Sequence, residues 1–397
     1  MPSDAGVGRA RPLAASAGPR LEAVDALRGL VMIVMALDHT RDFFGVPANP
    51  ADLTTASAAL FLTRWVTHFC APVFALLTGT SAYLASRGMT RPALSRYLWT
   101  RGLWLIVLEV TVVRCVAYQF NADYRVTMLL VLWSLGWSMV ALALLVRLPV
   151  GVVTAIGLSM IAAHNLLDGV RLAHPLWAIL HGPGFVVNQP DVVVFAAYPL
   201  IPWIGVTAVG FGLGRIFDWP ADARRTFLVR AGLACCAGFV IVRALNAYGD
   251  PSPWRTFPTP LYSALSFLNT TKYPPSLMFL LMTLGPALLA LRALERRTPR
   301  WLAPVLVFGR VPLFYYAVHF AAIHALALIV CVARVGTAAW MVTSPDLAHY
   351  PFTAPPGWGY SLPAVYAIWM GVVAGMFPLC AWFGRAKRER GGWLRYV

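Results

Sequence analysis

The sequence is poor in charged residues and in cysteine for its length. Only 12% of its 397 residues are Asp, Glu, Lys or Arg, whereas a soluble domain carries about 25%. This scarcity excludes an ordinary soluble domain. The six cysteines fall in apolar segments and show neither zinc-ligand spacing nor the pattern of a disulfide framework. We therefore expect them to be core residues, and we expect no metal site.

The sequence also lacks the short alternating segments of a membrane β-barrel and has long continuous apolar runs instead. Because 59% of the residues are hydrophobic, it predicts an all-α fold, a polytopic transmembrane helix bundle. The runs can cross a hydrocarbon core of about 30 Å. We expect about ten spans, or eleven if Gly309 and Pro312 break the ninth. The ten spans are residues 26–44, 66–85, 102–120, 127–146, 150–167, 192–215, 227–246, 276–294, 304–333 and 363–383.

Basic residues outnumber acidic ones by 32 to 16, which gives a net charge of +16. Basic residues beside spans set the orientation and contact anionic lipid, so the excess predicts contact with membrane lipid and no binding of nucleic acid. Arg-rich connectors alternate with poorer ones, which predicts that both termini are cytoplasmic. The expected organisation is a disordered cytoplasmic tail (1–20), a membrane domain (21–384) and a basic cytoplasmic tail (385–397).

The first predicted span carries Arg28, Asp38 and His39. Each ionisable group at membrane depth costs about 2.5–3.5 kcal/mol on insertion, so such groups usually mark function. Arg28 and His39 are about three helical turns apart, which places them on one face and roughly 16 Å apart along the axis. Adjacent helical residues diverge by about 100°, so Asp38 cannot orient His39 directly. We expect Asp38 to pair with Arg41 or with another helix.

Each of these residues also has a purely structural interpretation. The stretch from Asp38 to Asp42 fits a polar helix end at the membrane interface, and Arg28 fits a boundary residue paired with Asp25. Alternatively, the planar guanidinium of Arg28 receives a phosphate. The sequence leaves both interpretations open.

Other ionisable residues are secondary candidates. His68 opens the second predicted span at the same level as His39, and Lys272 precedes the eighth span. Glu109 and Arg114 lie in the third predicted span, and each is expected to take part in a structural ion pair with another helix. His319 is a candidate for lining a cavity, and its five-residue separation from His324 is too wide for a shared metal site. Arg310, near the inner end of the ninth span, is placed to meet an anionic ligand.

Several segments together resemble one membrane family. Leu21 to Leu30, followed by Asp38-His39, is similar to the start of the heparan-α-glucosaminide N-acetyltransferase-like family. Tyr198 to Trp203, Lys272 to Ser276 and Gly309 to Phe314 resemble further segments of its bacterial branch. The resemblance covers residues 20–383, and the spacing from Arg28 to His39 matches that of the wider transmembrane acyltransferase superfamily.

The resemblance implies an enzyme in the cytoplasmic (inner) membrane of a bacterium. Such an enzyme takes an acetyl group from cytoplasmic acetyl-CoA and passes it to an amine or hydroxyl of a sugar or amino-sugar acceptor on the outer side. The lysosomal relatives have their key His between the first two spans. Here none lies between Thr40 and Thr67, so His39 and His68 both remain candidates.

The residue roles that follow are expectations. The catalytic set is His39, His68 and Asp38; the set for the acyl donor is Arg28, Arg310 and Arg101; the set for the acceptor is Lys272, His319 and Asp42. The alternative function is a proton-coupled transporter of a small metabolite, with Asp38, His39, Glu109 and His319 as a proton relay. A non-enzymatic scaffold and a homo-oligomer also remain open.

Overall fold

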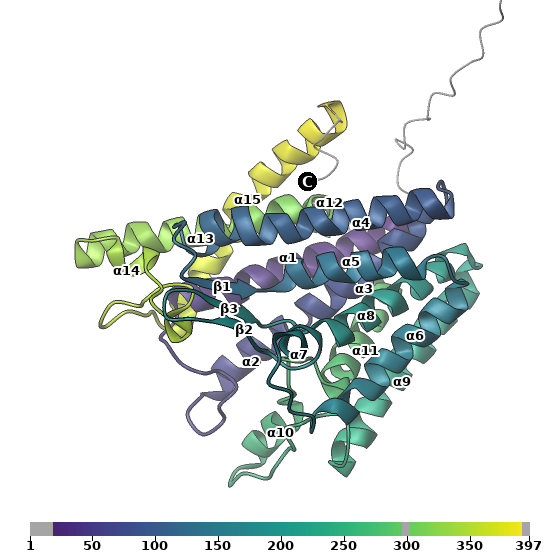
Figure 1. Ribbon diagram of the computed structural model, residues 1–397, viewed down its shortest axis with the longest axis horizontal. Helices are drawn as coiled ribbons and strands as arrows, with labels where there is room; N and C mark the ends of the chain where they lie inside the picture. The colour runs from purple at the N-terminus through teal and green to yellow at the C-terminus, as the bar shows by residue number, and fades with distance from the viewer. Residues whose placement is uncertain (1–18, 296–301, 391–397) are drawn as a thin grey trace, which may run out of the picture.

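The chain folds into a bundle of helices with α1 (Pro19–Phe44) at its centre. The computed structural model describes residues 19–295 and 302–390. Helix α1 contacts α3, α11, α12, α13 and α15 (Figure 1). Beside α1, the described residues form α2 (Ala58–Thr67), α3 (Cys70–Ser86), α4 (Arg91–Leu108), α5 (Val131–Leu145), α6 (Val150–Ala163), α7 (Pro175–Leu180), α8 (Leu200–Gly214), α9 (Ala221–Leu245), α10 (Pro260–Leu268), α11 (Leu277–Leu294), α12 (Ala303–Arg310), α13 (Pro312–Val335), α14 (Ala339–Val342) and α15 (Leu362–Arg390).

Three shorter helical turns and one wide helical segment extend these elements. The π-helical segment η1 (Glu109–Tyr118) continues α4, and the 3-10 turn η2 (His164–Leu167) continues α6. The 3-10 turns η3 (Arg215–Asp218) and η5 (Leu347–His349) lie after α8 and α14.

The predicted spans coincide with helices. Within residues 19–295 and 302–390, seven helical segments are long and apolar enough to cross a membrane, which supports an integral membrane protein. Helices α1 and α4 are not among the seven, since each carries more ionisable residues, and α5 is shorter. The count of ten spans therefore stays a prediction. The seven segments are Ala58–Ser86, Val150–Leu167, Leu200–Asp218, Ala221–Leu245, Leu277–Leu294, Pro312–Val335 and Leu362–Arg390.

A small sheet departs from the all-α prediction. It comprises β1 (Val126–Leu129), β2 (Gly184–Asn188) and β3 (Val193–Ala196), in the order β1-β3-β2, with β1 parallel and β2 antiparallel to β3. The first residues of the predicted spans 127–146 and 192–215 therefore form strands rather than helix. β-branched residues favour this extended backbone, and the helices begin only after Leu130 and Pro199.

Two predicted spans are divided by short breaks. The second begins eight residues earlier than predicted, as α2, and His68 lies at the junction between α2 and α3. The ninth is broken at Val311 into α12 and α13, as the sequence predicted, because Pro312 cannot donate the hydrogen bond that would continue α12.

The predicted tails are partly helical. Pro19 and Arg20, assigned to the N-terminal tail, begin α1, and residues 1–18 of that tail lie outside the described residues. Residues 385–390 of the predicted C-terminal tail continue α15, and the rest of that tail, residues 391–397, also lies outside the described residues.

Among the described residues, neither Glu109 nor Arg114 forms the expected ion pair with another helix. A Glu109 carboxylate oxygen instead accepts a hydrogen bond from the backbone N–H of Trp133 at 2.9 Å, in the first turn of α5. Arg114 donates to Asn121 and forms an ion pair with Asp123 at 3.0 Å. Glu109 thus bonds to the backbone of α5, and Arg114 bonds to the loop that follows η1 rather than to another helix.

Glycine pairs allow the main helix pairs to approach closely. A side chain at Gly79 of α3 would overlap the Thr207 carbonyl oxygen of α8, and one at Gly210 of α8 would overlap Leu76 of α3. Small residues at such crossings let the backbones pack without a hydrophobic driving force between helices. Similar close approaches join Gly29 to α12 and Gly309 to α1, Gly102 to Gly136, Gly157 to Gly205, and Gly232 to Gly285.

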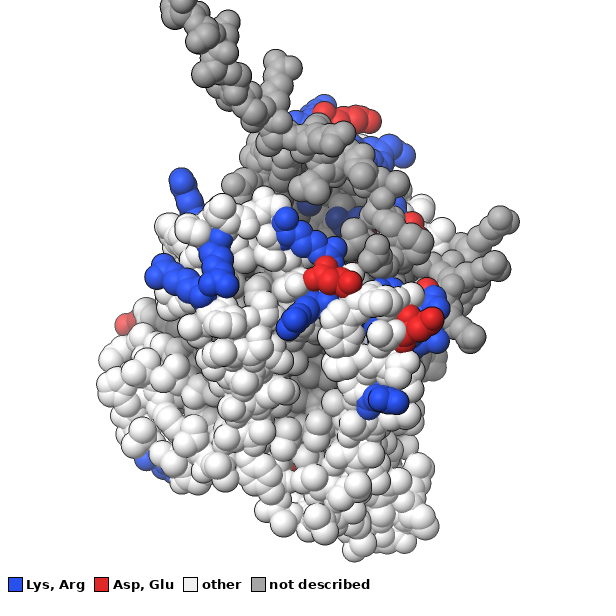
Figure 2. All heavy atoms as spheres, turned by 90° about the vertical axis from the view of Figure 1, so that its right-hand side faces the viewer, with Lys and Arg blue, Asp and Glu red and all other residues white. Residues whose placement is uncertain are grey.

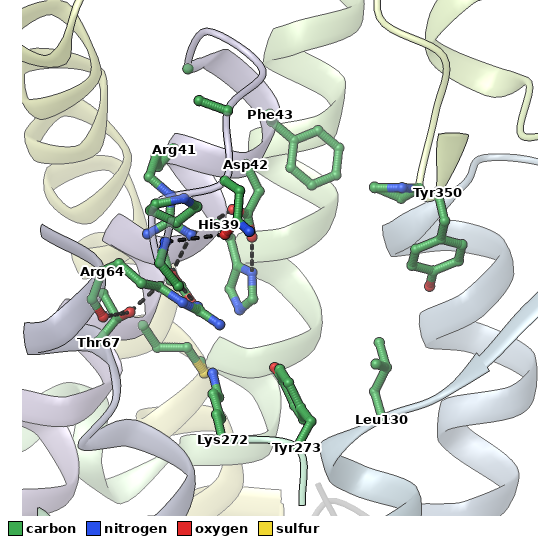
Figure 3. Close-up of a pocket in the computed structure, with 18 of the residues that line it drawn as sticks. His39, Arg41, Asp42, Phe43, Arg64, Thr67, Leu130, Lys272, Tyr273 and Tyr350 are labelled. Carbon is green, nitrogen blue, oxygen red and sulfur yellow. Dashed lines mark hydrogen bonds and ion pairs between the residues drawn. The ribbon is translucent and has the colours of Figure 1, made fainter. Parts of the chain in front are cut away.

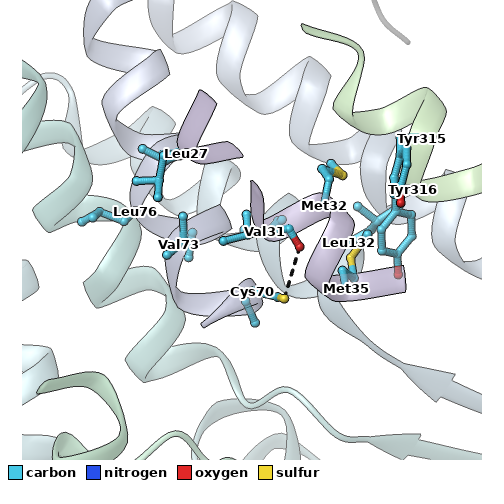
Figure 4. Close-up of a cluster of buried hydrophobic side chains, with 14 of the residues drawn as sticks. Leu27, Val31, Met32, Met35, Cys70, Val73, Leu76, Leu132, Tyr315 and Tyr316 are labelled. Carbon is cyan, nitrogen blue, oxygen red and sulfur yellow. Dashed lines mark hydrogen bonds between the residues drawn. The ribbon is translucent and has the colours of Figure 1, made fainter. Parts of the chain in front are cut away.

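The middle of α1 is apolar, and most of it is packed against neighbouring helices. Val31, Met32 and Met35 lie among side chains from α3, α5 and α13, and Tyr315 and Tyr316 point toward Met32 and Met35 (Figure 4). The Cys70 thiol donates to the Val31 carbonyl oxygen at 3.3 Å. This apolar segment separates the polar residues at the two ends of α1.

Charged side chains gather at one part of the molecular surface. Figure 2 shows Lys and Arg clustered over the upper half of one face, with fewer acidic side chains, above a broad surface almost free of charge. A polarised surface of this kind is typical of a helix bundle whose apolar flank faces lipid.

We expect Gly79→Leu to destabilise the bundle by at least about 3 kcal/mol, because the added side chain would push α3 away from α8. The control is Gly375→Leu in α15, where a side chain meets nothing within 4 Å. Denaturant titration in detergent micelles measures both free energies of unfolding. Equal stability of the two variants would contradict this packing.

Candidate functional site

A cavity of about 1000 Å³ opens at the C-terminal end of α1. It lies between α1, the junction of α2 and α3, and the connectors that precede α11 and α15. In Figure 3, Lys272 and Tyr273 approach His39 from one connector, while Tyr350 and Leu130 lie on the opposite wall. Its ionisable and tyrosyl lining comprises Asp38, His39, Arg41, Asp42, Arg64, His68, Tyr118, Tyr198, Lys272, Tyr273, Tyr316, His349 and Tyr350.

Asp38 is the centre of a buried ion cluster. Arg64 of α2 donates to both of its carboxylate oxygens at 2.8 and 2.6 Å, and Arg41 lies 2.7 Å from one of them. The Thr67 hydroxyl adds a hydrogen bond of 2.9 Å. The predicted pairing of Asp38 with Arg41 or with another helix is therefore confirmed on both counts. Because its oxygens are engaged by cations, Asp38 is not a free proton acceptor.

His39 presents its imidazole to the cavity. Its ring packs against Phe320 at a centroid distance of 3.8 Å and against His319 at 5.4 Å, and its side chain is 17% exposed. Nδ1 lies 3.9 Å from an Asp42 carboxylate oxygen, which is too far for a hydrogen bond. Asp42 is also held by Arg41 at 2.7 Å. Asp42, rather than Asp38, is thus the carboxylate that faces the His39 ring.

His68 and Lys272 line the same cavity as His39. His68 is buried, its ring lies 5.3 Å from that of Phe279, and its Nδ1 has no hydrogen-bond partner among the described residues. Lys272 Nζ lies 5.2 Å from the ring centre of Tyr273. Burial raises the pKa of Tyr273, but the cations Lys272 and Arg64 outweigh it and hold that pKa below its usual value. The structure thus brings both candidate histidines to one cavity.

His319 does not line this cavity. It is fully buried behind His39, and its Nδ1 is 2.8 Å from the Tyr315 carbonyl oxygen. Its ring stacks on Tyr315. His319 therefore supports the His39 ring and does not face the space where we expected it to contact an acceptor.

A second cavity of about 330 Å³ opens beside the polar N-terminal part of α1. Arg28 donates to Asp25 and to the Gly309 carbonyl oxygen, both at 3.0 Å, and to the Ser81 hydroxyl at 3.1 Å. Arg310 is half exposed and lies 3.8 Å from Glu22 and 3.9 Å from Asp25. Arg28, Arg101, Arg310 and Lys387 all line this cavity. The three arginines predicted for the donor are thus together.

The two cavities border on the same side chains. Phe74 of α3, Val131 of α5 and Tyr316 of α13 line both. On α1, Met32 faces the smaller cavity and Met35 the larger one. The apolar middle of α1 therefore lies beside a thin partition between a cationic cavity and one lined by histidines.

The sequence analysis missed some lining residues. Arg64 was not predicted because the second span was expected to begin at residue 66. An Arg inside the apolar run 58–67 could have marked it as a functional candidate. Lys387 was assigned to a tail, whereas it lies on α15 beside the smaller cavity. Tyr316 carries no sequence signal that separates it from other core tyrosines.

The comparisons with known proteins agree with this architecture. The family model described as heparan-alpha-glucosaminide N-acetyltransferase, catalytic, matches residues 20–244. That range is more than half of the chain and contains Arg28, His39, His68 and Arg101, whereas Lys272 and Arg310 lie beyond it. No curated protein was found to match the chain.

We expect Asp38→Ala to lower the free energy of unfolding by about 3–5 kcal/mol, because it leaves the Arg64 guanidinium without its counter-ion and Arg41 with Asp42 alone. The matched control is Asp222→Ala, which removes an exposed pair with Arg225 and changes stability by less than about 1 kcal/mol. Denaturant titration of both variants in detergent measures the difference. A loss at Asp38 no larger than the control would contradict the cluster's role.

Proposed function

The chain belongs to the heparan-alpha-glucosaminide N-acetyltransferase catalytic family, and from this we propose that it is a membrane acyltransferase with a defined route. It takes an acetyl or similar group from acetyl-CoA bound in the Arg28 cavity. It delivers that group to an amine or hydroxyl of a sugar-like acceptor in the His39 cavity. Family membership supports acetyltransferase chemistry in general; the donor, the acceptor and the route are our proposal.

One observation carries the route: Phe74, Val131 and Tyr316 line both cavities. A donor whose charged groups stay in the cationic cavity needs only a narrow passage for its acyl end. A partition formed by a few side chains, rather than by a full helix layer, is compatible with such a passage. A transporter relay of acidic and histidine side chains does not account for the four cations that line the smaller cavity, which has no acidic residue in its described lining.

The donor fits the smaller cavity by charge and size. Guanidinium groups bind phosphates bidentately, and Arg101, Arg310 and Lys387 line the cavity with Arg28. Its volume of about 330 Å³ is too small for a whole nucleotide cofactor but lies at the lower end of ligand pockets. We therefore place the phosphates of acetyl-CoA at the cavity mouth and its thioester arm inside.

The orientation follows from the same cations. We propose that the Arg28 end faces the cytoplasm, with both termini on that side and the His39 cavity outside. The clustering of basic side chains on one part of the surface supports this (Figure 2). The membrane would be the inner membrane of a bacterium, where acetyl-CoA is available on the cytoplasmic side only.

The chemistry assigned to His39 is general base catalysis. The imidazole takes a proton from the acceptor nitrogen or oxygen as this atom bonds to the acyl carbon, and the carbon–sulfur bond breaks to release CoA as a thiolate. Asp42 beside Nδ1 stabilises the imidazolium that forms. Lys272 and the arginines paired with Asp38 supply positive charge near the developing oxyanion. His68 is the second candidate for the base.

We expect His39→Ala to lower kcat for acetyl transfer by about 10²–10⁴-fold, the usual contribution of a positioned base. Purified protein with acetyl-CoA and a panel of amino sugars, glucosamine first, supplies the assay, and chromatography of CoA and product supplies the readout. His68→Ala is measured alongside. The control His174→Ala removes an exposed histidine outside both cavities and should leave kcat unchanged. If His39→Ala retains kcat within twofold while His68→Ala does not, the base is His68.

We expect Arg310→Gln to raise the KM for acetyl-CoA about tenfold with a smaller change in kcat, because it removes a charge-assisted contact to phosphate. Arg96→Gln is the control, an exposed arginine of α4 that does not line the cavity. Steady-state kinetics at saturating acceptor separate the two constants. An unchanged KM, or uptake of the acceptor that needs no acetyl-CoA, would contradict the donor site and favour the transporter.

A further inference from the structure

Three residues of metal-binding types meet at the end of α6, and none of them lines either cavity of the proposed reaction. His164 and Asp168 lie at the two ends of η2, and His181 follows α7. One potential ligand atom from each residue lies within 4.8 Å of the others. Among the described residues, this is the group of at least three His, Cys, Asp or Glu that satisfies such a geometry.

The imidazoles of His164 and His181 are buried, and three of their four ring nitrogens have no hydrogen-bond partner among the described residues. His164 is 2% exposed, and neither of its ring nitrogens has a hydrogen-bond partner among the described residues. His181 is 3% exposed, and its Nδ1 also has no partner. Buried polar atoms are normally satisfied, so an orphaned imidazole facing another imidazole and a carboxylate points to a bound group.

The spacing suits a tetrahedral ion. Zinc binds His nitrogen and carboxylate oxygen at about 2.0–2.2 Å, so neighbouring ligand atoms lie about 3.3 Å apart. His181 Nε2 and Asp168 Oδ1 are 3.2 Å apart. His164 is the more distant member and would move inward on binding. The other Asp168 oxygen accepts a hydrogen bond from Asn165 Nδ2 at 2.8 Å, which orients the carboxylate in the way of an outer-shell partner.

We propose that His164, Asp168 and His181 bind one divalent transition-metal ion, with Zn²⁺ as the best match for two imidazoles and one carboxylate. Asp168 and His181 line an open pocket of about 720 Å³, which provides an entry path and leaves a fourth position for water. This proposal replaces the expectation of no metal that came from cysteine spacing. It does not rest on the proposed acyl transfer.

The ion would clamp the end of α6 to α7 beside the main cavity. Asn165, next to His164, accepts a hydrogen bond from the Leu277 backbone N–H at 2.9 Å, at the start of α11. Pro274 lines the pocket at the cluster, while its neighbour Tyr273 lines the His39 cavity. The clamp therefore holds the connector that carries Lys272 and Tyr273.

The test is metal binding by the purified full chain, free of any histidine tag. The protein is stripped with a chelator, titrated with Zn²⁺, separated from free metal and analysed for bound zinc. We expect about one Zn²⁺ per wild-type chain. His164→Gln, Asp168→Asn and His181→Gln should each weaken binding at least about tenfold. The control His174→Gln removes an exposed histidine of the same pocket that is not in the cluster, and it should bind like wild type.

A second measurement keeps the test valid if a variant fails to fold. Co²⁺ added to stripped wild-type protein should give the visible absorption of a four-coordinate site, and one equivalent of Zn²⁺ should remove it. Wild-type protein that retains no zinc and shows no such absorption would overturn the proposal. Zinc bound equally by wild type and by all three folded cluster variants would overturn it as well.

Discussion

The ion cluster at Asp38 is the interaction on which the main site depends. One buried carboxylate holds Arg41 from its own helix and Arg64 from α2. Removing such charges from water is expensive, and their attraction offsets this only while all partners remain in place. The cluster thereby fixes α2 against the C-terminal end of α1, and it positions His39 beside a cavity whose local charge is set by neighbouring cations.

Helix α1 contributes residues to both cavities, and close packing of its neighbours holds these residues in place. Gly29 and Gly309 let α12 approach α1 closely enough for the Gly309 carbonyl oxygen to accept a hydrogen bond from Arg28. After the break at Val311, α13 continues alongside α1, and its Tyr316 lines both cavities. A helix-breaking sequence and a close glycine contact together place the donor residues and the partition.

The sequence predicted the parts of this architecture that depend on local physical chemistry. Apolar run length located the helices, Pro312 located the break in the ninth span, and the scarcity of charge at membrane depth singled out Arg28, Asp38 and His39. The resemblance to an acetyltransferase family is confirmed by the match over residues 20–244. Residue roles within the site remain predictions.

What could not be predicted depends on distant contacts. The pairing of β1 with β3 joins segments more than 60 residues apart, so residues 127–129 were predicted to begin a membrane span. Glu109 bonds to the backbone of α5 and Arg114 to the loop after η1, contacts that residue spacing does not reveal. The cluster of His164, Asp168 and His181 forms only when α7 folds back on the end of α6, and its sequence spacing matches no metal motif.

The most direct test of the account is a sided assay in vesicles. Protein is reconstituted in one orientation, labelled acetyl-CoA is supplied on the Arg28 side only, and glucosamine is enclosed on the His39 side only. The account predicts that labelled N-acetylglucosamine accumulates in the compartment that contains no acetyl-CoA. Labelled product confined to the acetyl-CoA side, or glucosamine that crosses the membrane without being acetylated, would contradict a transmembrane transfer between the two cavities.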